Sequence, residues 1–188
     1  MLEIEAKFAV RDEANLLGRL EACGFRIEQE LDQADYYYNH PARDFRETDE
    51  AFRIRVSGED LNLTYKGPRL DSRIKTRSEI ELPLSPQGAT LEAAQGMLLA
   101  LGFLPVASVV KLRRQGRLEH EGFTLNVAID RVVDAGDFIE IECLIERAKQ
   151  QEATDCVLHF ARQLGLTDHV TESYLGLVLR ERTKAGLV

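Results

Sequence analysis

The sequence lacks most of the features that identify common metal-binding and phosphate-binding classes. Its three cysteines are odd in number and isolated, which is typical of reduced thiols and not of a disulfide framework or a zinc site. Its histidines, His40, His120, His159 and His169, show no metal-ligand spacing. It has no glycine-rich phosphate-binding loop and no dinucleotide fingerprint. Any bound phosphate would therefore have to be held by side chains.

Long apolar runs are also missing, since none approaches the roughly 20 residues that a membrane-spanning helix needs. The chain begins with Glu3, Glu5 and Lys7 in a predicted strand, so we expect no secretory signal, no membrane partner and a cytoplasmic protein. A net charge of −8 argues against a general nucleic-acid-binding surface. With 188 residues, 44% hydrophobic and 30% charged, the chain is expected to form one domain over residues 1–188.

Alternating apolar and polar residues predict a chain rich in strands. Asp35 to Glu50 is interpreted as a strand followed by a long, ordered loop. Further strands are predicted at 2–10, 51–56, 61–66, 74–82, 109–113, 123–130 and 137–144, with Pro83 and Pro86 closing the one at 74–82. Helices are predicted from Asp12 to Gly24 and at 90–101, 153–164 and 174–182.

The charged residues of these strands are grouped by sign. Three segments carry two carboxylates spaced two apart, and three carry two cations spaced in the same way: Glu3/Glu5, Glu79/Glu81, Glu140/Glu142, Arg53/Arg55, Lys75/Arg77 and Lys111/Arg113. Residues i and i+2 of a strand share a face and lie roughly 7 Å apart, so each pair repels itself. A solvent-facing sheet is the simple alternative, but such faces usually mix the two signs. The pattern favours a closed barrel of about eight strands with its charged face inside.

A charged interior of this kind needs a charged ligand, because burying so many ions without one is costly. Clustered carboxylates suit hard divalent cations such as Mg²⁺ or Mn²⁺. Arginines bind phosphate oxygens in a bidentate manner, and lysines add point charges. A linear triphosphate bound with divalent cations is therefore the expected occupant.

The order of these motifs resembles the CYTH superfamily. It begins with an ExExK motif at Glu3 to Lys7 and continues along nearly the whole chain. The later matches are R-I-R at 53–55, T-Y-K-G-P at 64–68, R-x-E-x-E at 77–81, K-x-R at 111–113, Asp130 and E-I-E at 140–142. The segments 40–55 and 65–71 are similar to the class IV adenylyl cyclase branch in particular.

The resemblance implies an α+β fold, a closed eight-stranded antiparallel β-barrel (the triphosphate tunnel) with flanking helices. It implies metal ligands among Glu3, Glu5, Glu79, Glu81, Asp130, Glu140 and Glu142. It implies phosphate contacts from Lys7, Arg53, Arg55, Lys66, Lys75, Arg77, Lys111 and Arg113. Lys7, Glu5 and Glu142 are the residues expected to be catalytic, whereas Tyr174 matches a tyrosine-containing segment of cyclase-like members and equally fits helix packing.

Members of the superfamily include class IV adenylyl cyclases, thiamine triphosphatases and inorganic triphosphatases. The resemblance thus implies a metal-dependent enzyme, with Mg²⁺ or Mn²⁺, that converts ATP to cyclic AMP and pyrophosphate. Hydrolysis of tripolyphosphate, thiamine triphosphate or a nucleoside triphosphate is the alternative, and a non-catalytic polyphosphate- or nucleotide-binding module is a second one. Dimers are common among similar proteins, so a homodimer is compatible with the resemblance.

Overall fold

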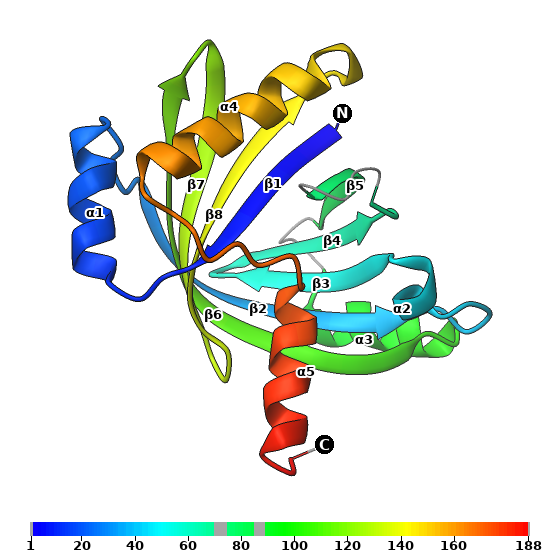
Figure 1. The fold of residues 1–188 in the computed structure, drawn as a ribbon. Coiled ribbons are helices and arrows are strands. Elements are labelled where there is room, and N and C mark those ends of the chain that lie inside the picture. The colour runs from blue at the N-terminus through cyan, green and yellow to red at the C-terminus, as the bar shows by residue number, and fades with distance from the viewer. Residues whose placement is uncertain (1, 70–74, 85–88, 188) are drawn as a thin grey trace.

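The chain folds into a closed antiparallel barrel, seen in a computed structural model that describes residues 2–69, 75–84 and 89–187. The strands are β1 (Leu2–Ala9), β2 (Gln29–Asn39), β3 (Ala51–Ser57), β4 (Asp60–Lys66), β5 (Lys75–Leu84), β6 (Leu104–His120), β7 (Phe123–Val132) and β8 (Gly136–Ile145). Their order around the barrel is β1-β5-β4-β3-β2-β6-β7-β8, and pairing of β8 with β1 closes it. This confirms the predicted eight-stranded architecture (Figure 1).

Helices lie outside the barrel and at one of its ends. They are α1 (Glu13–Ala22), α2 (Phe45–Thr48), α3 (Leu91–Ala100), α4 (Gln150–Gln163) and α5 (Tyr174–Lys184), with a short 3₁₀ turn at Arg147–Lys149. The side chains of Asp12, Thr90 and Ser173 accept hydrogen bonds from backbone amides in the first turns of α1, α3 and α5. None of the helices in the described part of the chain is long and apolar enough to cross a membrane.

The main hydrophobic core lies between the barrel wall and the helices α1 and α4. The outward-facing residues of β1, among them Ile4 and Phe8, pack with Leu20 of α1 and with Val157 and Phe160 of α4. Figure 1 shows α4 lying across β7, β8 and β1. Burial of each of these apolar side chains stabilises the fold by about 1.5–3 kcal/mol. This packing directs the alternate residues of the same strands, which are polar, into the barrel.

A second hydrophobic cluster covers one end of the barrel, where α5 packs. It joins Tyr174, Leu177 and Val178 at the start of α5 to Val109 of β6 and Phe138 of β8. Val109 and Phe138 share the face of their strands with the charged residues Lys111 and Glu140, so they face the interior. The α5 end of the interior is therefore apolar and covered.

Three local predictions differ from the structure. The strand expected at 109–113 is part of β6, a 17-residue strand that continues through Gly116, where an added Cβ would lie 2.1 Å from the carbonyl oxygen of Arg26. Pro83 does not end its strand but lies within β5, where it pairs with Asn62 of β4. In the described residues, the pairing of β5 with β1 on its other side involves only residues 75–78. The loop predicted after β2 contains α2, which Asp44 caps. Ile74 and Pro86 lie outside the described residues.

Candidate functional site

Charged side chains of all eight strands meet in the barrel interior. The predicted site residues occupy inward-facing positions of the described strands. For Lys75 only the backbone is described. Glu3, Glu5, Lys7, Lys111, Arg113, Asp130 and Glu140 are buried, and Glu81 is exposed. The buried members thus form one charged region inside the barrel, to which the exposed Glu81 does not belong.

Three carboxylates converge in this interior, and we call Glu3, Glu5 and Glu142 the acidic cluster. One oxygen of each lies within 4.8 Å of those of the other two. Burial, together with the neighbouring carboxylate of Glu140, raises the pKa of Glu142 to about 7. Burial also raises the pKa of Glu3 well above its usual range, despite the nearby ammonium of Lys66. The cluster therefore crowds negative charge that a divalent cation would neutralise.

Lys66 of β4 partly offsets this charge. Its Nζ donates hydrogen bonds of 2.9 Å to both carboxylate oxygens of Glu3 and lies 3.2 Å from Glu79 Oε2. Burial alone would lower the pKa of Lys66, but Glu3 and Glu5 raise it above its ordinary value. Glu79 therefore lies beside the acidic cluster, whereas Glu81, two residues along β5, meets the Thr64 hydroxyl at 3.4 Å.

Asp35 of β2 was not predicted to be a site residue, yet it holds two predicted phosphate contacts in place. Its Oδ1 accepts from Arg55 Nε at 2.7 Å, and its Oδ2 accepts from Arg55 Nη2 at 2.8 Å and Arg53 Nη1 at 3.3 Å. Burial would raise the pKa of Asp35, but the two guanidinium groups hold it well below its usual range. The signal available in the sequence was its position two residues before Tyr37, on the inward face of an aromatic strand.

Asp130 of β7 arranges a second pair of cations. Arg113 donates to it through Nε at 2.7 Å and Nη2 at 2.6 Å, and Lys111 Nζ donates at 3.3 Å. Arg113 also donates to Glu140. Burial and the adjacent Arg113 lower the pKa of Lys111 to about 8. Four donors, including the Tyr174 hydroxyl at 2.7 Å, thus occupy the carboxylate of Asp130.

Lys7 lies at the apolar, α5 end of the interior. Its Nζ donates to the backbone oxygen of Glu172 at 2.6 Å and lies 4.0 Å from the centroid of the Tyr174 ring. Lys111 Nζ lies 4.9 Å from the same centroid. Tyr174 therefore has two roles. It packs in the hydrophobic cluster under α5, and its ring also contacts lysines of the charged interior.

Exposure of the interior side chains differs between the two sides of the barrel. Those of Asp130, Lys111 and Asp35 are at most 1% exposed, whereas those of Arg53 and Lys66 are 12% and 15% exposed. The Nε of Arg53 is buried without a hydrogen-bond partner in the described part of the structure. Solvent therefore reaches part of the Arg53 and Lys66 side chains, although the Arg53 Nε itself is buried.

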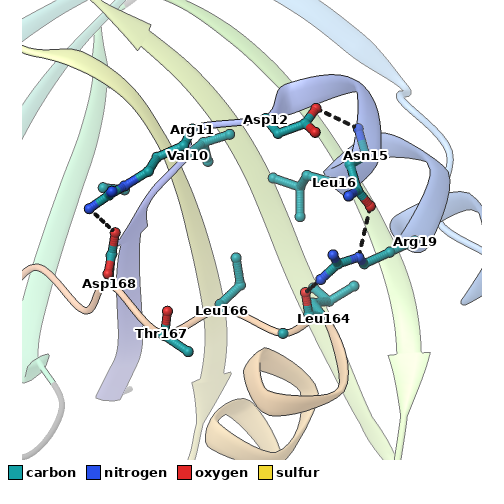
Figure 2. A pocket seen from close by; sticks show the side chains of 12 residues that line it. Val10, Arg11, Asp12, Asn15, Leu16, Arg19, Leu164, Leu166, Thr167 and Asp168 are labelled. Atoms are coloured by element: carbon teal, nitrogen blue, oxygen red, sulfur yellow. Dashed lines mark hydrogen bonds and ion pairs between the residues drawn. The ribbon is translucent and has the colours of Figure 1, made fainter.

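A cavity of about 180 Å³ outside the barrel is a weaker candidate (Figure 2). It lies between the end of β1, the start of α1 and the turn after α4. Arg11 pairs with Asp168 at 2.8 Å, and Arg19 donates to Asn15 Oδ1 at 2.9 Å and to the Leu164 oxygen at 2.7 Å. Its cations are thus engaged by the protein itself, so we place the candidate site in the barrel interior.

Comparisons with known proteins agree with this architecture. A Methanocaldococcus jannaschii protein named "putative adenylate cyclase" is 34% identical over 152 residues, which cover 81% of this chain and 82% of that protein. The solved structure of PH1819 from Pyrococcus horikoshii is 36% identical, with a TM-score of 0.84 over 96% of this chain and 99% of that one. A Hippeastrum protein described as a putative adenylyl cyclase with a dominant triphosphatase activity has a TM-score of 0.64 at 15% identity. The match covers 100% of this chain and 96% of that one, and it shows the fold alone. The CYTH domain model matches residues 1–174, and the chain belongs to the CYTH family.

Proposed function

We propose that this chain is a metal-dependent enzyme that converts ATP to cyclic AMP and pyrophosphate, with the triphosphate of ATP held in the barrel interior. The observation that carries the proposal is the placement of the acidic cluster and a set of lysines and arginines inside one barrel. The 34% identity to a protein named as a putative adenylate cyclase supports cyclisation as the reaction.

The acidic cluster fits a hard divalent cation. Its three carboxylates place oxygens within 4.8 Å of one another, and oxygen is the ligand that Mg²⁺ and Mn²⁺ prefer. Glu3, Glu5 and Glu142 would hold the ion, with Glu79 beside them through Lys66. When bound, the ion would supply positive charge and Lewis acidity to phosphate oxygens.

The cations of β3 and β4 are proposed to bind the triphosphate. Arg53, Arg55 and Lys66 are partly exposed, and their guanidinium and ammonium groups match phosphate oxygens. Asp35 acts as a positioning residue, because its two oxygens bind Arg55 through two nitrogens and one of them also accepts from Arg53. A preorganised cationic site costs little reorganisation when charge develops on the leaving pyrophosphate.

In the proposed reaction, the ribose 3′ oxygen forms a bond to the α-phosphorus, and the bond from that phosphorus to the pyrophosphate oxygen breaks. The 3′ hydroxyl loses its proton to solvent, which reaches the side of the interior where Arg53 and Lys66 are partly exposed. Arg53, Arg55 and Lys66 stabilise the negative charge that grows on pyrophosphate. Lys7 and Lys111, which are buried at the α5 end, add positive charge to the same interior.

Hydrolysis of a triphosphate is the second candidate. The interior-facing side chains of the described strands that form the site are mostly charged, so they recognise phosphate groups without selecting a nucleobase. The same residues would then bind tripolyphosphate or another triphosphate, and water would replace the ribose hydroxyl as the attacking group. The two reactions share their binding groups and differ in their products.

The deciding experiment incubates the purified protein with Mg²⁺ or Mn²⁺ and either ATP or tripolyphosphate, followed by chromatographic separation of the products. Cyclic AMP with equimolar pyrophosphate is the expected result. Inorganic phosphate from tripolyphosphate, with no cyclic nucleotide from ATP, would establish the hydrolase instead. Binding of either compound without turnover would leave only a polyphosphate-binding module.

Variants test whether the acidic cluster carries the reaction. Glu5→Gln and Glu142→Gln preserve side-chain volume and are expected to retain the barrel and lose metal-dependent turnover. Glu21→Gln, on the exposed surface of α1, is the matched control and is expected to keep full activity. Full activity in both cluster variants would refute the assignment of the site.

A further inference from the structure

The turn between β6 and β7 meets α4 on the outside of the barrel and brings two histidines together. His120 ends β6, Glu121 lies in the turn, and His159 lies on α4. One nitrogen or oxygen of each of the three side chains lies within 4.8 Å of the others. The histidine spacing in the sequence indicated no metal ligands, because these residues approach one another only through the fold.

Contacts between the turn and the helix fix this group in place. His159 Nδ1 lies 2.6 Å from Glu121 Oε1, and the rings of His120 and His159 have centroids 5.8 Å apart. The His120 ring also packs on Phe160, with centroids 4.9 Å apart. In addition, the Cys156 thiol donates to the backbone oxygen of His120 at 3.4 Å. The three side chains are therefore held by two packed elements and not by a free loop.

A separate observation concerns the His120 imidazole. Its Nε2 atom is buried and has no hydrogen-bond partner in the described part of the structure. A buried polar atom left unpaired is costly, and native proteins usually satisfy such atoms. A neutral imidazole nitrogen with a free lone pair is also the commonest metal ligand in proteins.

We propose that His120, Glu121 and His159 form a second metal site, for a zinc-class divalent cation, that joins the β6–β7 turn to α4. Two imidazoles and one carboxylate are a ligand set that Zn²⁺ accepts, with water at the fourth position. The imidazoles distinguish this site from the acidic cluster, whose oxygens suit Mg²⁺ or Mn²⁺. The proposal does not depend on the proposed reaction, because the two sites share no residue.

The test measures Zn²⁺ binding by calorimetry and Co²⁺ binding by visible absorption. It uses the full chain carrying Glu5→Gln and Glu142→Gln, so that the acidic cluster cannot contribute. One equivalent of Zn²⁺ is expected to bind and to raise the melting temperature. Adding His159→Ala, at an exposed position, is expected to weaken binding more than tenfold, since even losing a partner of a ligand costs about 10- to 100-fold.

Two comparisons make the result specific. His169→Ala removes an exposed histidine elsewhere and is expected to leave Zn²⁺ affinity unchanged, whereas His120→Asn is expected to weaken it. Circular dichroism checks that each variant is folded. No Zn²⁺ binding by the Glu5→Gln/Glu142→Gln chain, equal affinity after His159→Ala, or a thiolate charge-transfer band in the Co²⁺ spectrum would overturn the proposal.

Discussion

Lys7 Nζ donates a hydrogen bond to the backbone oxygen of Glu172, 2.6 Å away, and so ties the first strand of the barrel to the residues that lead into α5. The ammonium also lies over the ring of Tyr174. One buried lysine therefore belongs both to the charged interior and to the contacts that hold the helix covering it.

Replacing Lys7 with Met should loosen this end of the barrel. Methionine fills a similar volume but cannot donate to the Glu172 oxygen, and a hydrogen bond from a charged group is worth about 1.5–3 kcal/mol. Amide hydrogen exchange at the start of α5 is expected to accelerate, while exchange in β7 stays close to that of the parent. Unchanged exchange in α5 would show that its packing alone holds the helix.

The Tyr174 hydroxyl should contribute to stability through Asp130. Tyr174→Phe keeps the ring in its cluster but removes a 2.7 Å hydrogen bond to a fully buried carboxylate. The free energy of unfolding is expected to fall by about 1–3 kcal/mol in denaturant titrations. Tyr174→Ala also removes the ring and should cost about 3–5 kcal/mol. Equal losses in the two variants would mean that the ring contributes nothing.

Glu142→Gln should stabilise the metal-free protein at pH 8. A carboxyl group whose pKa is raised from 4.5 to about 7 binds its proton more tightly in the folded state, so stability is lost as pH rises between these values. Glutamine removes this loss, with an expected gain of roughly 2 kcal/mol because solvent reaches part of the side chain. Chemical unfolding at pH 4 and pH 8 measures it: the gain should be present at pH 8 and absent at pH 4.

The affinity for Mn²⁺ should rise with pH, because the ion and the proton compete for the acidic cluster. With a pKa of about 7, the ionised fraction of Glu142 increases about tenfold from pH 6 to pH 8. Calorimetric titration with Mn²⁺ is expected to show at least this increase. Glu142→Gln should bind more weakly and with a smaller pH dependence. A pH-independent affinity in the parent would remove Glu142 from the ligands.

Arg55→Ala should weaken triphosphate binding. The change removes one cation of the interior and leaves Asp35 paired with Arg53 alone. Loss of a charge-assisted contact is expected to reduce affinity by about tenfold to a hundredfold. The measurement is calorimetry with Mn²⁺ and a tripolyphosphate analogue that has methylene bridges between its phosphorus atoms. Arg46→Ala, on the exposed side of α2, is the control, and an equal loss in both variants would exclude a specific role for Arg55.

Much of the barrel could be predicted from the sequence, because the alternation of apolar and charged residues determines which way each strand faces. The full length of β6 could not, since Gly116 and Pro105 interrupt the pattern of a strand that remains paired to β2 and β7 around them. The position of Pro83 within β5 could not be predicted either. Proline is tolerated there because, among the described residues, this part of β5 pairs with β4 and not with β1.

For the barrel interior, the sequence predicted which residues face inward better than it predicted their contacts. Pairs of like charges indicated which residues face inward, but not which of them meet. Asp35 was missed because a single carboxylate in an aromatic strand has no partner in the sequence; its direct neighbour across the sheet is Arg55. The meeting of His120 and His159 likewise depends on how α4 packs against the barrel, which no local pattern specifies.

The pairing of opposite charges inside the barrel has a thermodynamic consequence. Three ion pairs, Lys66 with Glu3, Arg55 with Asp35 and Arg113 with Asp130, compensate much of the charge inside the barrel. A bare polyanion entering it would leave a large uncompensated charge in a medium of low dielectric constant, and so would divalent cations alone. The polyanion and the divalent cations are therefore expected to bind with positive cooperativity. Each raises the affinity for the other by the same factor.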